Sequence, residues 1–312
     1  MNILFYTIDP DPPRWVEVLQ QALPGATIAT YPDGAGMQAD YAVCWKPPAD
    51  FFNGQQRIRA VFNVAAGVDF ILAHPALQQG YLRDVPISRL GDAGMAAQME
   101  EYVLAAALRW QRKLDTYATQ QRNGVWKMLG PKKRDRVTVG VLGLGVLGTH
   151  VAQGMHRFGY RAAGWSRSAR LVDGVDCHHG AQGLRDFLAG TDVLVCLLPL
   201  TEDTRGILNR TNLAQLPQGA HVVNIGRGAH LVEADLLALL DAGHLGGATL
   251  DVFPEEPLPA ASALWAHPRV LITPHVSAST LREESMLQIA EKIRAFERGA
   301  TLTDLVDRQR GY

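Results

Sequence analysis

The chain has 312 residues, 47% of them hydrophobic and 20% charged, and its formal net charge is −1. This length predicts about two domains, and the even balance of charge disfavours a nucleic-acid-binding protein. Because no apolar run approaches the length of a membrane span and the first residues lack the features of a signal peptide, we expect a cytoplasmic protein that does not bind membranes. The three cysteines, Cys44, Cys177 and Cys196, are too widely spaced for a typical metal site, so we expect no metal and three reduced thiols.

The first part of the chain has the pattern of an α/β unit. Apolar runs predict strands at residues 2–6, 41–45, 60–64 and 85–90, with a helix at 15–22. After the third strand comes the small-residue segment Ala65-Ala66-Gly67-Val68-Asp69. This loop is suited to present backbone N–H groups to an anion, although an ordinary turn between a strand and a helix explains it equally well.

A long helix is predicted from about residue 96 to residue 121. Its apolar positions are compatible with a subunit interface and also with packing in the core: Met99, Tyr102, Val103, Ala106 and Leu108. We expect a domain junction near the start of this helix. The substrate domain would comprise residues 1–98 and 281–312, and the dinucleotide-binding domain residues 99–280.

The most specific motif is the glycine pattern G-x-G-x-x-G at Gly143, Gly145 and Gly148, which follows an apolar strand and precedes an amphipathic helix. The first glycine permits a tight turn, the second lets the backbone approach a pyrophosphate, and the third lets the helix pack close to the strand. The phosphates would then lie at a helix N-terminus. This context predicts a dinucleotide site.

The next strand, residues 161–165, indicates which dinucleotide is bound. Sites that prefer NAD place an acidic residue here, whereas NADP sites use arginine and hydroxyl groups. This chain has Ser166, Arg167 and Ser168 and no acid until Asp173. We therefore expect a preference for NADPH, with weaker use of NADH; a solvated basic turn is the alternative.

Three further strand ends carry side chains capable of catalysis: Arg227 after strand 221–225, Glu256 after strand 247–252, and His275 after strand 270–273. Ligands of open α/β sheets bind at this edge. Reduction of a 2-oxo acid needs a proton donor and a cation for the carboxylate, which suit histidine and arginine. A glutamate next to the histidine would favour the charged imidazole ring and hold its orientation. Taken singly, each of the three is also compatible with a surface role.

The order and spacing of these motifs resemble those of the D-isomer-specific 2-hydroxyacid dehydrogenases over nearly the whole chain. The resemblance rests on the central glycine pattern, on Asn224/Arg227/Gly228, on Asp251-Val252-Phe253 with Glu256-Pro257, and on Pro274-His275. Within the family, the chain is most similar to the glyoxylate/hydroxypyruvate reductase branch. The segments behind this similarity are 43–48, 65–69, 92–95, 165–168, 272–275 and 306–312.

The resemblance implies two Rossmann/flavodoxin-like α/β lobes with parallel, doubly wound sheets, in which the discontinuous substrate domain contains an inserted dinucleotide-binding domain. It also implies NADPH-dependent reduction of glyoxylate to glycolate and of hydroxypyruvate to D-glycerate by a homodimer. His275 would donate the proton, Glu256 would be its partner, and Arg227 would hold the substrate. The other expected substrate contacts are the backbone N–H groups of Ala66 and Gly67 and the side chains of Trp45 or Met95, for which simple packing is the alternative. The other expected cofactor contacts are Val146, Leu147, Leu198, Pro199, Gly226 and Asp251. Asp251 would contact the nicotinamide amide; a turn residue or a structural acid is the alternative.

Two alternative functions stay open from the sequence. One is a 2-hydroxyacid dehydrogenase for another 2-oxo acid. The other is a non-catalytic protein that senses a dinucleotide, which the joint presence of Arg227, Glu256 and His275 disfavours.

Overall fold

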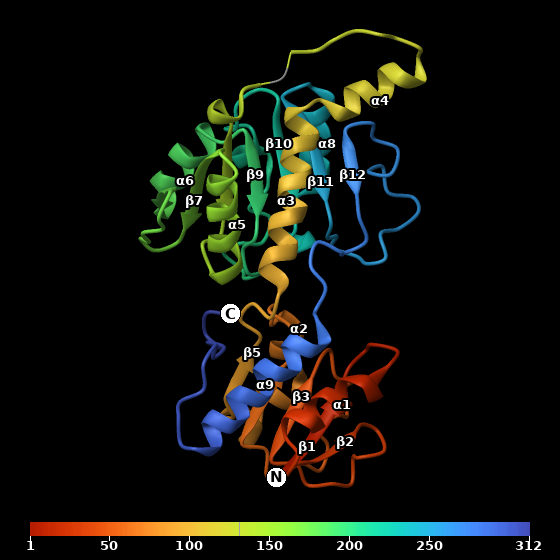
Figure 1. The fold of residues 1–312 in the computed structure, drawn as a ribbon, viewed down its shortest axis with the longest axis vertical. Coiled ribbons are helices and arrows are strands. Elements are labelled where there is room, and N and C mark those ends of the chain that lie inside the picture. Colours follow the sequence, from red (N-terminus) through yellow and green to blue (C-terminus); the bar gives the residue numbers. More distant parts are fainter. Residues whose placement is uncertain (131) are drawn as a thin grey trace. The chain divides into compact units, whose positions relative to one another are not determined.

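The structure is a computed structural model that describes residues 1–130 and 132–312. The chain forms two compact units (Figure 1): unit 1 comprises Met1–Gly94 and Thr280–Tyr312, and unit 2 comprises Met95–Ser279. Unit 1 is therefore discontinuous, and unit 2 is inserted into it. Among the helices of the described residues, none has both the length and the apolar character needed to cross a membrane.

Unit 1 contains a five-stranded parallel sheet with the order β2-β1-β3-β4-β5. Every residue of β3 and β4 is buried, as expected for parallel strands with both faces covered. Helices α1 and α9 pack against each other, although they come from opposite ends of the chain (Figure 1). The bounds are β1 Asn2–Tyr6, α1 Pro12–Ala22, β2 Thr27–Thr30, β3 Tyr41–Cys44, β4 Ala60–Asn63, α2 Asp69–Leu72, β5 Ile87–Arg89 and α9 Arg282–Glu297.

Unit 2 contains a seven-stranded parallel sheet with the order β12-β11-β10-β9-β6-β7-β8. The two sheets thus have the strand orders of flavodoxin-like and Rossmann folds, which confirms the expected fold class. The bounds are α3 Met95–Gln111, α4 Leu114–Arg122, β6 Thr138–Leu142, α5 Val146–Arg157, β7 Arg161–Ser166, β8 Val175–His179, α6 Gly180–Ala189, β9 Val193–Cys196, α7 Arg210–Leu213, β10 Ala220–Asn224, α8 Glu233–Asp241, β11 Leu245–Leu250 and β12 Val270–Ile272.

The prediction of a single long helix at residues 96–121 is wrong, because the structure has two helices there. Lys113 adopts a left-handed backbone conformation with φ 55°, which interrupts the helix between α3 and α4. The turn lets Asp115 pair with Arg109 at 2.6 Å. No glycine or proline marks this break. The apolar face of α3 packs largely into the core of unit 2, where Val103 and Ala106 are buried.

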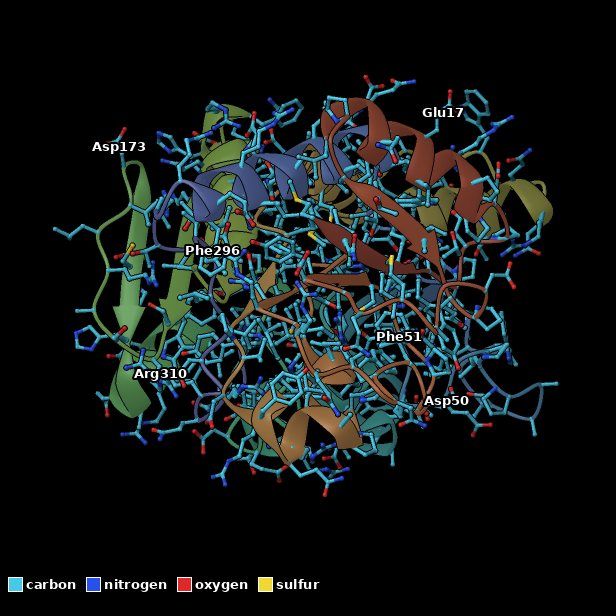
Figure 2. All side chains as sticks on the ribbon, turned by 90° about the horizontal axis from the view of Figure 1, so that it is seen from below. Glu17, Asp50, Phe51, Asp173, Phe296 and Arg310 are labelled. Carbon is cyan, nitrogen blue, oxygen red and sulfur yellow. The ribbon has the colours of Figure 1, made fainter. Side chains whose placement is uncertain are left out.

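Two edge strands, β2 and β8, are absent from the sequence prediction. Both are only partly buried, so they lack the continuous apolar run that marks the inner strands. The turn before β8 is exposed: Figure 2 shows Asp173 at its outer end, with the carboxylate pointing away from the ribbon.

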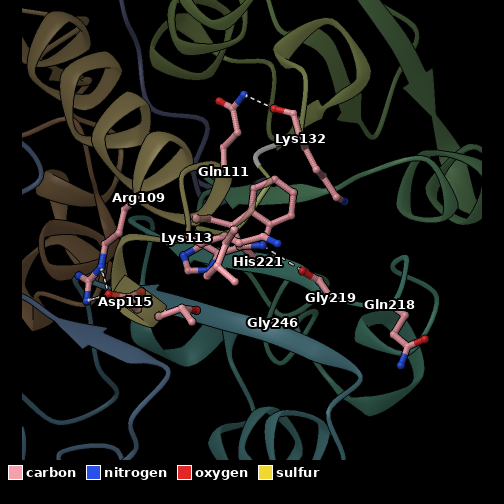
Figure 3. A pocket seen from close by; sticks show the side chains of 12 residues that line it. Arg109, Gln111, Lys113, Asp115, Lys132, Gln218, Gly219, His221 and Gly246 are labelled. Atoms are coloured by element: carbon pink, nitrogen blue, oxygen red, sulfur yellow. Dashed lines mark hydrogen bonds and ion pairs between the residues drawn. The ribbon is translucent and has the colours of Figure 1, made fainter. Parts of the chain in front are cut away.

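A cavity of about 380 Å³ lies at the amino ends of β10 and β11 (Figure 3). Trp110 lines it and donates a hydrogen bond from Nε1 to the carbonyl of Gly219 at 2.9 Å. His221, which is 3% exposed, also lines it, and its Nε2 lies 2.9 Å from Thr249 Oγ1. Burial, together with the nearby Arg109, lowers the pKa of His221 to about 3. His221 is therefore neutral in the folded protein at ordinary pH.

His221 should make the stability of unit 2 sensitive to acid. Its pKa is lower in the folded than in the unfolded chain, so between about pH 6.5 and pH 3 the unfolded chain binds more protons, and stability falls as the pH falls. At pH 5 this one group should cost about 2 kcal/mol relative to pH 7.5. We expect His221→Gln to lose less stability than the wild type between these pH values in urea unfolding. Equal losses in the two proteins would contradict the assignment.

Candidate active site

The turn between β6 and α5 begins at Gly143, which has φ +105°. A Cβ atom at this position would lie 2.9 Å from the carbonyl oxygen of Leu197, so a side chain is excluded by both conformation and space. The N–H of Gly143 donates to the carbonyl of Trp165 at 2.9 Å and ties the turn to β7. Gly143 therefore has the position expected of the first glycine of a dinucleotide turn.

The two other glycines of the motif differ in their surroundings. A Cβ atom on Gly148 would lie 1.8 Å from the Gly143 carbonyl oxygen, so the helix can approach the strand only with glycine there. Gly145 has no heavy atom near its Cβ position and precedes α5 as the N-cap residue. No side chain caps this helix, and its first turn has no acid. Val146 and Leu147 begin the helix, and its N-terminal N–H groups, which have no partner within a helix, are the groups that a pyrophosphate would bind.

The strand register brings the functional loops of unit 2 to one edge of the sheet. Leu142, Cys196, Asn224, Leu250 and Ile272 form one row across five neighbouring strands, and the loops begin immediately after them. Leu198 and Pro199 follow β9, which is adjacent to β6 at the point where the strand order reverses. Gly226 follows β10, and a Cβ atom there would lie 3.3 Å from the carbonyl oxygen of Cys196. Residues expected at the cofactor site thus lie on adjacent loops.

The end of β7 carries the residues expected to recognise NADPH. Arg167 has a side chain that is 55% exposed, and its Nη1 lies 3.9 Å from Asp203 Oδ2. Ser168 is exposed, whereas the buried Ser166 donates its hydroxyl to the carbonyl of Ser168 at 2.8 Å. Of the three predicted residues, Arg167 and Ser168 present their side chains to the surface and Ser166 does not.

Arg227 lies on the loop after β10, and backbone contacts fix this loop. Asn224 Nδ2 donates to the Arg227 carbonyl at 3.0 Å, and the Arg227 N–H donates to His230 Nδ1 at 3.1 Å. A Cβ atom on Gly228 would lie 1.9 Å from the backbone of Phe253, so the loops after β10 and β11 touch here. The half-buried guanidinium of Arg227 donates from Nη1 to the Gly226 carbonyl at 2.8 Å.

Glu256 and His275 form a direct pair, although 19 positions separate them. His275 Nδ1 lies 2.9 Å from Glu256 Oε2, and the N–H of Phe253 donates to Glu256 Oε1 at 3.0 Å. An ionised carboxylate only accepts hydrogen bonds, so Nδ1 carries a hydrogen and the ring orientation is fixed. The His275 side chain is 44% exposed. The pair can therefore present Nε2 to a ligand as a proton donor.

Asp251 is fully buried below the His275 loop, and its carboxylate is occupied by groups of the protein. Thr273 Oγ1 and the N–H groups of Val276 and Ser277 donate to it at 2.5, 2.8 and 2.8 Å. This geometry matches the structural acid that the sequence left as an alternative to a nicotinamide contact. From the sequence, Tyr102 is placed only among the apolar positions of a helix and Thr273 only within segment 272–275, so neither is predicted as a site residue.

In unit 1, Ala66 and Gly67 lie in the loop after β4. Side chains of the protein donate hydrogen bonds to the carbonyl groups of this loop. Asn63 Nδ2 donates to the carbonyls of Ala65 and Gly67 at 3.0 and 2.9 Å. Arg89 Nη1 donates to the carbonyl of Ala66 at 3.3 Å. Asn63 and Arg89 are neighbours in register at the ends of β4 and β5. Neither was predicted as a site residue, because strand pairing is not readable from the sequence.

The two remaining predicted residues have simple surroundings. Trp45 follows β3 and is partly buried, and its backbone N–H donates to the Tyr6 carbonyl at 2.9 Å. Next to it, Lys46 has φ 49° and places Nζ 4.1 Å from the ring centroid of Phe70. Met95 is buried and begins α3 in unit 2. Within residues 1–130 and 132–312, no cluster of three or more histidine, cysteine or acidic side chains could hold a metal ion.

Comparison with known proteins places this arrangement in a family. Residues 104–277 match the family described as D-isomer specific 2-hydroxyacid dehydrogenase, NAD binding domain. The chain is 45% identical to glyoxylate/hydroxypyruvate reductase A of Yersinia enterocolitica and to that of Serratia proteamaculans, with all of each chain covered.

Two solved structures are similar over the whole chain. A D-isomer specific 2-hydroxyacid dehydrogenase from Xanthobacter autotrophicus, in complex with NADPH and MES, is 40% identical with a TM-score of 0.93 and covers 100% of this chain and 99% of its own. An NADPH-dependent glyoxylate/hydroxypyruvate reductase from Sinorhizobium meliloti, in complex with NADP and sulfate, is 37% identical with a TM-score of 0.92 and the same coverage. The chain belongs to the D-isomer specific 2-hydroxyacid dehydrogenase family.

Proposed function

We propose that this protein reduces glyoxylate to glycolate and hydroxypyruvate to D-glycerate with NADPH. The observation that carries the proposal is the 2.9 Å pair of His275 and Glu256 at the sheet edge that also bears the glycine turn. A dinucleotide-sensing protein has no need of a positioned proton donor. The relatives from Yersinia, Serratia and Sinorhizobium are named glyoxylate/hydroxypyruvate reductases, and the two solved relatives are in complex with NADPH or NADP.

The residues of unit 2 fit a nicotinamide dinucleotide, because the Gly145 position is open and the first turn of α5 is uncapped. Gly143, Gly145, Val146, Leu147 and Gly148 would hold its phosphates. Further contacts would come from Leu198, Pro199 and Gly226. When bound, the cofactor supplies the hydride for the carbonyl carbon.

His275 supplies the proton in this proposal. Its Nε2–H donates to the carbonyl oxygen of the substrate, which becomes the hydroxyl oxygen of the product. Glu256 holds the ring by accepting from Nδ1 and stabilises the positive charge on the ring before the proton leaves. Arg227 holds the substrate carboxylate, because a guanidinium presents two parallel N–H groups to it.

The loop after β4 offers a second group of carboxylate ligands. Asn63 and Arg89 hold the carbonyls of Ala65, Ala66 and Gly67, and a loop fixed in this way would direct the N–H groups of Ala66 and Gly67 to an anion. We assign these two N–H groups to the substrate carboxylate. Trp45 and Met95 are the side chains proposed to limit the size of the substrate.

We also propose that the protein is a cytoplasmic homodimer. All three cysteines are free thiols, which suits a reducing compartment. The segment after α4 exposes large apolar side chains: Trp126 is 103% and Met128 is 91% exposed. Exposed apolar side chains that are close together mark surfaces that bind another protein.

The cofactor preference can be tested at Arg167. We expect initial rates on glyoxylate to be higher with NADPH than with NADH, because the guanidinium of Arg167 pairs with the 2′-phosphate. Arg167→Asp should weaken NADPH binding by about 100-fold and change NADH binding little, measured by fluorescence titration. Arg14→Asp, which makes the same charge change at an exposed position of α1, serves as the control. Wild-type rates that are equal or higher with NADH would contradict the preference.

The proton donor can be tested at His275. His275→Ala should lower kcat on glyoxylate and hydroxypyruvate by about 10² to 10⁴-fold while NADPH binding persists, because the developing alkoxide loses its acid. Glu256→Gln should lower kcat less, since the ring stays present but loses its carboxylate partner. Near-full turnover by His275→Ala would remove this residue from the mechanism. If the wild-type protein binds NADPH but does not oxidise it in the presence of any 2-oxo acid tested, the protein is instead a sensor.

The carboxylate-binding loop can be tested at Asn63. Asn63→Asp replaces the two N–H donors with an acceptor and adds a negative charge, so the loop should lose its conformation and repel the substrate. We expect KM for glyoxylate to rise by about tenfold or more, with the dissociation constant of NADPH unchanged. Asn53→Asp places the same charge on an exposed turn of unit 1 and should leave both constants unaltered. An unchanged KM in Asn63→Asp would refute the role of the loop.

A further inference from the structure

His275 has an unusual backbone conformation for a residue with a side chain. Its φ is +56°, in the left-handed region that favours glycine. Such a conformation is strained for a residue with a Cβ atom and persists only where the surrounding structure enforces it. The contacts that enforce it therefore decide where the imidazole ring lies.

Asp251 supplies the contacts on the backbone of this loop. Its carbonyl accepts the N–H of His275 at 2.8 Å. Its carboxylate oxygens Oδ1 and Oδ2 accept the N–H groups of Val276 and Ser277, both at 2.8 Å. Three consecutive N–H groups thus bind one buried residue, and the loop closes around Asp251.

Two hydroxyl groups continue this network away from the loop. Thr273 Oγ1 donates to Asp251 Oδ1 at 2.5 Å, so its only hydrogen is used. Tyr102 Oη lies 2.5 Å from Thr273 Oγ1 and must be the donor in that contact. Burial raises the pKa of Tyr102 to about 12, which keeps its hydroxyl protonated. Hydrogen bonds therefore run in one direction, from Tyr102 on α3 through Thr273 to Asp251.

We propose that Tyr102 and Thr273 are positioning residues for the proton donor: their hydroxyl groups fix the Asp251 carboxylate, which holds His275 in its left-handed conformation. This inference rests on the proposed role of His275. Neither hydroxyl touches the imidazole ring in the contacts described above, so both act through Asp251.

The network matters because His275 must meet a partner from another loop. Glu256 is fixed by the N–H of Phe253, and the ring reaches it only when the loop after β12 is held in place. Displacement of a reacting group by about 1 Å can cost 10²-fold in rate. If the Asp251 carboxylate rotates, the N–H groups of Val276 and Ser277 lose their acceptors together, and the ring moves away from Glu256.

The test compares Thr273→Val, which keeps the side-chain shape but removes the hydroxyl, with Thr273→Ser, which keeps the hydroxyl. We expect Thr273→Val to lower kcat on glyoxylate by about tenfold or more, with the NADPH dissociation constant and the KM for glyoxylate within about threefold of wild type. Thr273→Ser should restore most of kcat. Tyr102→Phe should lower kcat by a smaller factor, since Thr273 keeps its bond to Asp251. Equal kcat losses in Thr273→Val and Thr273→Ser would overturn the proposal.

A control variant separates positioning from a general loss of packing. Thr191→Val removes another buried hydroxyl of unit 2, which donates to the Phe187 carbonyl at 2.7 Å. It should lower the melting temperature about as much as Thr273→Val while leaving kcat unchanged. An equal kcat loss in Thr191→Val would show that the Thr273→Val loss comes from lower stability of the protein, and it would overturn the proposal.

A double-mutant cycle tests whether the network acts through His275. In a His275→Ala background, Thr273→Val should have no further effect on the residual kcat, because the group being positioned is gone. A further loss of the same size would show that Thr273 acts elsewhere and would refute the inference. If His275→Ala itself keeps full kcat, the proposed proton donor fails; if only the Thr273→Val effect is missing, the positioning role alone fails.

Discussion

The parallel register of the unit 2 sheet is the constraint on which the candidate site depends. Because five strands end in one row, residues far apart in sequence begin their loops at the same level: Gly143, Leu197, Ile225, Asp251 and Thr273. The strand order then decides which loops are neighbours. The loop with Glu256 follows β11 and the loop with His275 follows β12, its neighbour, so a pair separated by 19 positions can meet at 2.9 Å.

Close backbone approaches convert this common edge into a site of defined shape. A Cβ atom on Gly148 or on Gly228 would lie within 2 Å of backbone atoms: those of Gly143 in the first case and those of Phe253 in the second. At Gly148 the approach brings α5 against its own turn, so that the helix N-terminus faces the open position at Gly145. At Gly228 it joins the loop bearing Arg227 to the loop bearing Glu256. Glycine therefore sets the distances between the loops that carry the polar groups.

Much of this arrangement could be predicted from the sequence, and what could not has physical causes. Periodicity and motif spacing indicate the inner strands, the glycine turn and the residues Arg227, Glu256 and His275, because these signals are local. The break between α3 and α4 at Lys113 could not be predicted, because no glycine or proline marks it in the sequence. The left-handed conformation of Lys113 and the ion pair of Arg109 with Asp115 are visible only in the structure. Asn63 and Arg89 acquire their roles from strand pairing, and Tyr102 acquires its role from packing of α3 against the sheet.

The surroundings of Asp251 illustrate why a buried carboxylate is retained in such a site. Burial of a carboxyl group costs much free energy unless the group is hydrogen-bonded. Here two backbone N–H groups and one hydroxyl satisfy it, and the same bonds offset the strain of the left-handed His275. A loop held only by apolar packing could relax to an extended conformation and move the ring away from Glu256. The polar network thus links the burial of one acid to the orientation of the proposed proton donor.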